Sequence, residues 1–156
     1  SNRNGVSGRE DFYCDFLVVG CLNWLWKRYS SGTLLFVALG VLLVDQFSKH
    51  FMRIFFSDVV VYNTGAAFSL FEGWQTLFAV VGTVVIAVIL FSLRKYPHLE
   101  VGLLLGGVAG NVVDRLVYGA VIDFIHAGWW PTFNLADAAS TLAVVLLLLR
   151  ELFQKH

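Results

Sequence analysis

One apolar stretch limits the possible folds of this chain more than any other feature. From Gly73 to Leu93 the sequence contains no ionisable residue, and the stretch ends at Arg94 and Lys95, with Pro97 just beyond. A helix needs roughly 20 mainly apolar residues to cross the hydrocarbon core of a bilayer. Of the 156 residues, 58% are hydrophobic and only 14% are charged, which is too few polar residues to cover a soluble core. We therefore expect an integral membrane protein.

Four such segments, each bounded by helix breakers, predict an all-α membrane protein with four transmembrane helices. Their approximate bounds are 33–52, 73–94, 98–118 and 134–153. The third segment carries Gly102, Gly106 and Gly110 at every fourth position, which places small residues on one face and lets a neighbouring helix approach closely in lipid. We expect this helix to pack at the centre of the bundle.

These segments divide the chain into an extension, a membrane domain and a tail. Residues 1–32 contain an apolar stretch too short to span, which favours an interfacial helix or a remnant of processing. Residues 33–153 form the predicted four-helix domain, and residues 154–156 a cytoplasmic tail. Within the domain, residues 51–72 include a β-prone run followed by a turn, which predicts a small outward-facing β element.

Basic residues near the ends of the predicted spans indicate an orientation. Those that fall on one side of the membrane are Lys27, Arg28, Arg94, Lys95, Arg150 and Lys155. Short cytoplasmic loops are enriched in Lys and Arg, so we expect this side to be cytoplasmic. Lys49 and Arg53 lie on the opposite side and are exceptions to this rule.

Charge and cysteine content argue against several classes of function. Lysine plus arginine equal aspartate plus glutamate, so the basic excess typical of nucleic-acid binding is missing. Cys14 and Cys21 have no zinc-type spacing with histidine, which predicts no structural metal and no obligatory disulfide. Ser48 and Lys49 are adjacent and would point about 100° apart on a helix, which disfavours a Ser/Lys peptidase.

Ionisable residues inside or beside the spans are the candidate functional groups, because charges in a bilayer are costly. Asp45 and Lys49 are four residues apart on one helix face, which indicates a structural ion pair. Asp114 lies beside Arg115, which favours a neutralised pair in a supporting role. Asp123 has apolar neighbours, and apolar surroundings raise the pKa of a carboxyl group.

Asp123 and Asp137 stand at the expected outer face, where the third span ends and the fourth begins. A short connection allows the two carboxyl groups to approach, share one proton and hydrolyse a peptide through an activated water. Asp137 has a structural alternative, since Asn134 could cap the helix and Asp137 could complement its dipole. The residues alone leave these two readings of Asp137 about even.

Five sequence blocks, in order, resemble the signature of the lipoprotein signal peptidase family, also called signal peptidase II. The resemblance covers about residues 33–153. The blocks are Asp45-Gln-Phe-Ser-Lys49, Asn63-Thr-Gly-Ala-Ala-Phe68, Gly106-Gly-Val-Ala-Gly-Asn-Val-Val-Asp-Arg115, Val121-Ile-Asp-Phe124 and Phe133-Asn-Leu-Ala-Asp137.

The resemblance implies an aspartyl endopeptidase that needs no cofactor and cuts a prolipoprotein just before its diacylglyceryl-modified cysteine. By matching motif, the catalytic aspartates fall on Asp123 and Asp137. The polar or supporting positions of the site fall on Asn63, Gly65, Asn111, Asp114, Arg115 and Asn134. The family also implies globomycin-type inhibitors, contact with membrane lipid, and a monomer in the bacterial cytoplasmic (inner) membrane whose site faces the periplasm or the exterior.

Two features depart from the family pattern, and other functions stay open. Lys49 and Asn63 are close in sequence, which predicts a reduced outer β element, and the extension before residue 33 has no clear counterpart. A catalytically inactive membrane protein that binds lipoproteins is the main alternative, and it would tolerate Asp→Asn changes at Asp123 or Asp137. A proton relay is a third, less favoured reading.

Overall fold

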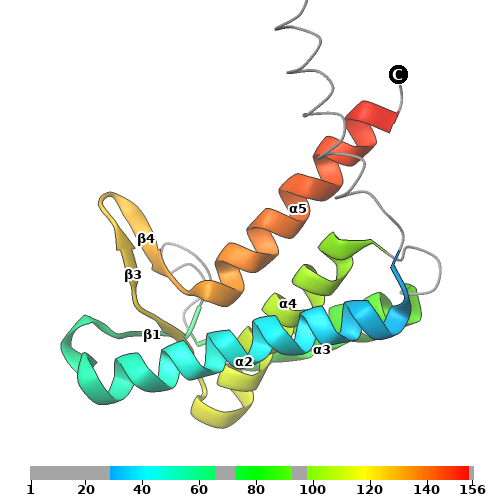
Figure 1. The fold of residues 1–156 in the computed structure, drawn as a ribbon. Coiled ribbons are helices and arrows are strands. Elements are labelled where there is room, and N and C mark those ends of the chain that lie inside the picture. The colour runs from blue at the N-terminus through cyan, green and yellow to red at the C-terminus, as the bar shows by residue number, and fades with distance from the viewer. Residues whose placement is uncertain (1–28, 66–72, 93–97, 155–156) are drawn as a thin grey trace, which may run out of the picture.

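The computed structural model describes residues 29–65, 73–92 and 98–154. The expected interfacial helix and both cysteines lie outside these residues. The described part contains four long helices, α2 (Ser31–Phe55), α3 (Gln75–Ser92), α4 (Leu99–Tyr118) and α5 (Leu135–Gln154), and four short strands at one end of the helices (Figure 1).

The four expected helices are present, but their ends differ from the prediction at α2. Ser30 caps this helix by accepting a hydrogen bond from Thr33 N at 3.2 Å, so α2 begins at Ser31, before the predicted boundary at residue 33. At its other end α2 continues to Phe55, into the predicted outer loop. The run from Phe51 to Phe55 is apolar apart from Arg53 and contains no helix breaker, which explains the longer helix.

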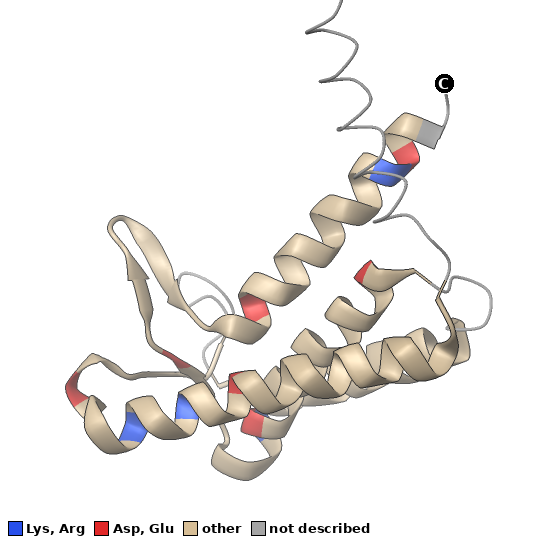
Figure 2. Cartoon of the chain, in the orientation of Figure 1, with Lys and Arg blue, Asp and Glu red and all other residues tan. Residues whose placement is uncertain are grey.

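Helices α2, α3 and α4 are long and apolar enough to cross a bilayer. No charged residue lies in α3, and Figure 2 shows the charges of the described helices near their ends or where helices meet. Helix α5 is as long as α4 but carries Asp137 near its start and Arg150 and Glu151 near its end. Its crossing of the membrane therefore stays a prediction.

Helix α4 packs against α2, α3 and α5, which confirms its expected central position. The glycines explain how closely it can pack. A Cβ atom on Gly102 would come within 2.9 Å of Leu34 O, and one on Gly106 within 2.6 Å of Ala38 O, both on the backbone of α2. Gly107 approaches Ala136 and Ser140 of α5 in the same way. Small residues at these positions let both α2 and α5 pack closely against α4, and Gly110 lies near both of these helices.

The described residues of the predicted β-prone loop contain one strand, and the partner of that strand lies in another connection of the chain. Strand β1 (Val61–Asn63) pairs with β2 (Val121–Asp123), which comes from the connection between α4 and α5, in antiparallel register with Val61 opposite Asp123. Strands β3 (Ile125–Ala127) and β4 (Trp130–Phe133) form an irregular hairpin. Pairing across the two connections holds Asn63 and Asp123 close together, a juxtaposition that local sequence patterns do not contain.

Candidate active site

The polar site forms where α4 ends and α5 begins. Helix α4 stops at Gly119, which adopts φ 69°, a left-handed conformation that glycine enters without steric cost. The chain then turns into β2, whose residues are all buried and whose last residue is Asp123. After the β3–β4 hairpin it re-enters the helical bundle at Asn134.

Asn134 and Asp137 form a reciprocal cap at the start of α5. Asp137 N donates to Asn134 Oδ1 at 2.9 Å, and Asn134 N donates to Asp137 Oδ2 at 3.2 Å. This is the geometry of a capping box, which satisfies two backbone donors at once. The structural alternative for Asp137 is therefore present, but it uses only one carboxylate oxygen.

The other oxygen of Asp137 faces α4. Asn111 Nδ2 donates to Asp137 Oδ1 at 2.7 Å. The Oδ1 atom of Asn111 accepts from Lys49 Nζ at 3.2 Å and from Asn134 Nδ2 at 3.1 Å. Two donors on this oxygen leave the Asn111 amide nitrogen as the group that must face Asp137. The orientation of the Asn111 amide is thus determined by its surroundings.

Asp123 receives a neutral amide donor on each carboxylate oxygen. Asn134 Nδ2 donates to Oδ1 at 2.7 Å, and Asn63 Nδ2 donates to Oδ2 at 3.1 Å. Burial raises the pKa of Asp123 to about 6, the amide donors from Asn63 and Asn134 oppose that rise, and the nearby Asp137 carboxylate adds to it. Asp123 can therefore carry a proton near neutral pH, as its apolar sequence neighbours predicted.

Three charged residues form a buried ion cluster behind this site. Lys49 Nζ lies 2.7 Å from both Asp45 Oδ2 and Asp114 Oδ2, and the side chains of Lys49, Asp45 and Asp114 are 1%, 0% and 0% exposed. The predicted Asp45–Lys49 pair is therefore confirmed. The predicted pairing of Asp114 with Arg115 is wrong, because adjacent residues diverge on a helix and the Asp114 side chain instead faces α2.

The ion cluster also holds the surrounding backbone. Asp45 Oδ1 accepts from Ala136 N at the start of α5 at 2.9 Å, and Asp114 Oδ2 accepts from Ile122 N in β2 at 3.1 Å. Each aspartate thus fixes a backbone segment immediately next to one cavity carboxylate, at Ala136 beside Asp137 and at Ile122 beside Asp123. This arrangement supports the predicted structural role of Asp45 and Lys49 and the supporting role of Asp114.

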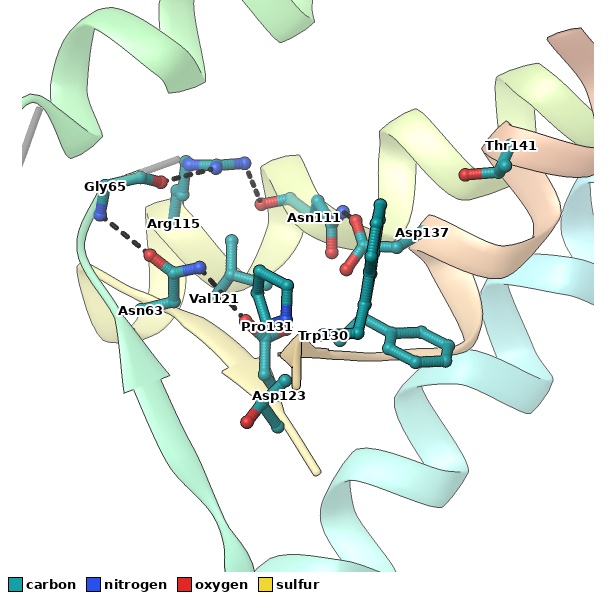
Figure 3. Close-up of a pocket in the computed structure, with 12 residues that line it drawn as sticks. Asn63, Gly65, Asn111, Arg115, Val121, Asp123, Trp130, Pro131, Asp137 and Thr141 are labelled. Atoms are coloured by element: carbon teal, nitrogen blue, oxygen red, sulfur yellow. Dashed lines mark hydrogen bonds between the residues drawn. The ribbon is translucent and has the colours of Figure 1, made fainter. Parts of the chain in front are cut away.

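Arg115 lies on α4, one helical turn after Asn111, and its side chain reaches toward Gly65, just past the end of β1. Its Nη2 donates to Gly65 O at 3.5 Å and its Nη1 to Asn111 O at 3.4 Å, both long contacts. Its buried Nε has no hydrogen-bond partner among the residues that the structure describes. Gly65 N in turn donates to Asn63 Oδ1 at 3.0 Å, which directs the amide nitrogen of Asn63 toward Asp123 (Figure 3).

One cavity of about 310 Å³ collects these groups. Asp123 and Asp137 both line it, together with Asn63, Gly65, Asn111 and Arg115 (Figure 3). Of the predicted residues, fully buried Asn134 lies behind the wall, and Asp45, Lys49 and Asp114 form the cluster beyond it. The lining residues that sequence analysis missed are Val121, Trp130, Pro131, Thr132, Phe133 and Thr141.

Sequence patterns offered a signal for only some of these missed residues. Thr141 stands four residues after Asp137, on the same face of α5, so helical spacing could have found it. The residues from Trp130 to Phe133 belong to β4, and their place over the cavity depends on the fold of the hairpin.

In chemical terms, the cavity offers one carboxyl group that is easily protonated, a second held by an amide and a capping N–H, and a guanidinium group. This set of groups suits acid–base hydrolysis of a polar bond.

Comparisons with known proteins identify one family. The family model described as signal peptidase (SPase) II matches residues 37–153. A lipoprotein signal peptidase of Burkholderia multivorans is 44% identical and one of Burkholderia ambifaria is 45% identical, each match covering 81% of this chain and 93% of the relative. Two solved structures described as bacterial membrane enzymes superpose with TM-scores of 0.74 and 0.72, at 25% and 26% identity, over 83% and 81% of this chain.

Proposed function

Since this chain belongs to the signal peptidase II family, we propose that it removes signal peptides from diacylglyceryl-modified prolipoproteins by cutting just before the lipid-bearing cysteine. Membership makes it a peptidase, and its three apolar helices together with its membrane-enzyme neighbours make it a multi-pass membrane protein. The proposal adds an aspartyl mechanism, a cleavage position and a location.

The observation that carries the mechanism is the meeting of two carboxyl groups on one cavity. Asp123 and Asp137 come from different elements, β2 and α5, yet both line the cavity, and a single amide, that of Asn134, contacts Asp123 and the backbone N–H of Asp137. Neither forms an ion pair within the part of the chain that the structure describes. Carboxyl groups arranged in this way can share a proton instead of being held as fixed anions.

The chemical step divides between the two aspartates. Ionised Asp137 takes a proton from a water molecule, whose oxygen attacks the scissile carbonyl carbon, while protonated Asp123 donates its proton to the carbonyl oxygen. The tetrahedral diol then collapses: the C–N bond breaks, the leaving amine receives a proton from Asp137, and a diol hydroxyl group returns a proton to Asp123, which restores both aspartates to their starting states. The reaction needs neither a metal ion nor a nucleophilic side chain. The pKa of Asp123, raised to about 6 by burial, suits the donor role.

The remaining cavity groups suit an extended peptide. Arg115 holds its present contacts at 3.4 and 3.5 Å and has an unused Nε donor among the described residues, so it can turn toward substrate carbonyls. An apolar space of about 450 Å³ continues from the cavity along α5, past Ala138, Leu142 and Val145. These side chains suit the apolar part of a substrate that shares the bilayer.

The location follows from the same geometry. We place α2 to α5 across the bacterial cytoplasmic membrane, with the β strands and the cavity at the outer face, and treat residues 33–153 as the peptidase domain. Phe36 and Phe91, which are 77% and 92% exposed, are side chains that lipid would cover. Arg150 is buried in an ion pair, so the orientation depends on basic residues outside the described part of the chain.

The proposal is tested with purified protein and a diacylglyceryl-modified prolipoprotein, whose cleavage is followed by gel shift. We expect the native chain to cut it, globomycin to inhibit it, and Asp123→Asn and Asp137→Asn each to lower the rate by about 10³-fold or more. Ser57→Ala, on an exposed turn, serves as the matched control and should cut normally. Substrate binding without cleavage by the native chain would instead favour a lipoprotein-binding protein, and near-native cleavage by either aspartate variant would overturn the dyad.

A further inference from the structure

A second cavity, of about 430 Å³, lies between α3, α4 and α5 at the other end of the bundle. Arg150 lines it, and this residue lies roughly 20 Å from Asp137 along α5 at a helical rise of about 1.5 Å per residue. The cavity is bounded by Ser92, where α3 ends, and by His98, the N-cap of α4. With α3, α4 and α5 across the bilayer as proposed above, this end of the bundle lies at the depth of the lipid headgroups.

Arg150 brings unused hydrogen-bond donors to this cavity. Its Nη1 forms an ion pair with Glu100, and the two side chains are only 5% and 2% exposed. Its Nε and Nη2 are buried and have no partner among residues 29–65, 73–92 and 98–154. Buried donors without acceptors are costly, and guanidinium groups bind phosphate oxygens through paired N–H donors. The unpaired nitrogens thus call for an oxygen-bearing ligand.

The walls and charges define the class of ligand. Five apolar side chains, from all three helices, line the cavity: Val88, Ile89, Val101, Leu104 and Leu147. Two carboxylates, Glu100 and exposed Glu151, lie beside Arg150, which is the one guanidinium group among the described residues that line the cavity, so a purely anionic ligand would meet repulsion from these carboxylates. An ammonium group on the ligand would relieve it.

We propose that this cavity binds one membrane phospholipid with an amine-bearing headgroup. Its phosphate oxygens accept hydrogen bonds from Arg150 Nε and Nη2, its ammonium group lies near Glu151, and an acyl chain packs against the apolar wall. The N-terminus of α4, whose cap His98 makes no side-chain capping bond, adds a favourable field for the phosphate. This site is separate from the proposed peptidase site.

Native mass spectrometry of the full chain in detergent tests the proposal, with phosphatidylethanolamine, phosphatidylglycerol and phosphatidylcholine as probes. We expect a retained phosphatidylethanolamine adduct that binds roughly tenfold more weakly in Arg150→Lys, which keeps the charge facing Glu100 but loses two donors. Arg53→Lys, at the opposite end, is the matched control and should retain the adduct. Equal retention by Arg150→Lys and the native chain would overturn the site.

Two further measurements keep the proposal testable if Arg150→Lys fails to fold. Glu151→Gln changes an exposed residue and should remove the preference for phosphatidylethanolamine over phosphatidylcholine, whose headgroup has no N–H donor. Equal binding of the two lipids by the native chain would contradict the headgroup assignment. Inorganic phosphate should leave the melting temperature unchanged relative to chloride at equal ionic strength, and stabilisation equal to that by the lipid would indicate a small-anion site instead.

Discussion

Two groups of aspartates lie next to each other in this protein and have opposite surroundings. In the ion cluster, Asp45 and Asp114 share the ammonium group of Lys49, and each also accepts a backbone N–H from a neighbouring element. At the cavity, the donors that Asp123 and Asp137 receive from the described part of the chain are amide side chains and a capping N–H. In the ion cluster each aspartate is paired with an ammonium group, whereas the carboxyl groups at the cavity accept hydrogen bonds from uncharged donors.

This difference distinguishes carboxyl groups that hold structure in place from carboxyl groups that can take part in a reaction. A buried carboxylate beside an ammonium group depends on that partner for stability, because loss of either partner leaves the other charge unpaired in a low dielectric. A buried carboxyl group that accepts from neutral amides keeps its geometry in both protonation states. The amides of Asn111 and Asn134 join the two groups, since Asn111 contacts Lys49 on one side and Asp137 on the other.

Removal of the shared cation should have the largest effect. Lys49→Met leaves Asp45 and Asp114 buried without a counter-charge, and we expect the free energy of unfolding to fall by about 3–5 kcal/mol. Denaturant titration in detergent micelles measures this loss. The double variant Lys49→Met with Asp114→Asn removes one of the two uncompensated charges and should recover part of it. Native-like stability of Lys49→Met would show that the ion cluster does not anchor the fold.

Removal of the connecting amide should mainly affect the chemical step. In Asn111→Ala, Asp137 loses its side-chain donor, so we expect kcat to fall by about 10²-fold with little change in KM. Steady-state cleavage of a lipid-modified prolipoprotein gives both constants. Ser48→Ala, which removes a hydroxyl group from α2 outside the cavity, is the control. A normal kcat in Asn111→Ala would show that the contact of Asn111 with Lys49 and Asp137 does not contribute to catalysis.

A smaller effect is expected when Asn63 is replaced, and it is a shift in the pH dependence of kcat/KM. Below about pH 6 Asp123 is protonated and can donate, and above it the proton is lost, so kcat/KM of the native chain should fall as the pH rises through about 6. The Asn63 amide stabilises the ionised form, so Asn63→Ala raises the pKa of Asp123 further and moves this fall to higher pH. A pH–rate profile measures both, and a shift to lower pH would contradict the donor role of Asp123.

The helices could be predicted from the sequence because their signal is local. A run of apolar residues from Gly73 to Leu93 and glycines at every fourth position in 98–118 each act within one helix or between two packed helices. The Asp45–Lys49 pair could be predicted for the same reason, as both residues lie on one turn of α2. The family was identified from five ordered blocks, and the comparisons confirm it.

The sequence could not show how separate connections combine. Strand β1 pairs with β2 in a register that places Val61 opposite Asp123, and the Asn63 side chain donates a hydrogen bond to Asp123, 60 positions away. Asp114 was assigned to its sequence neighbour Arg115, but its partner is Lys49 on another helix. Trp130 and Phe133 reach the cavity only because the β3–β4 hairpin folds beside it.

The hydrogen bond from Ala136 N to Asp45 Oδ1 has a consequence for biosynthesis. It joins positions 91 residues apart, and it holds the first turn of α5, where Asp137 resides, against α2. A nascent chain that has inserted α2, α3 and α4 still lacks Asp137 and the contact that positions it. In the proposed aspartyl mechanism, proteolytic competence therefore arises only when the last helix has docked, and an unfinished chain would be unable to cut its neighbours.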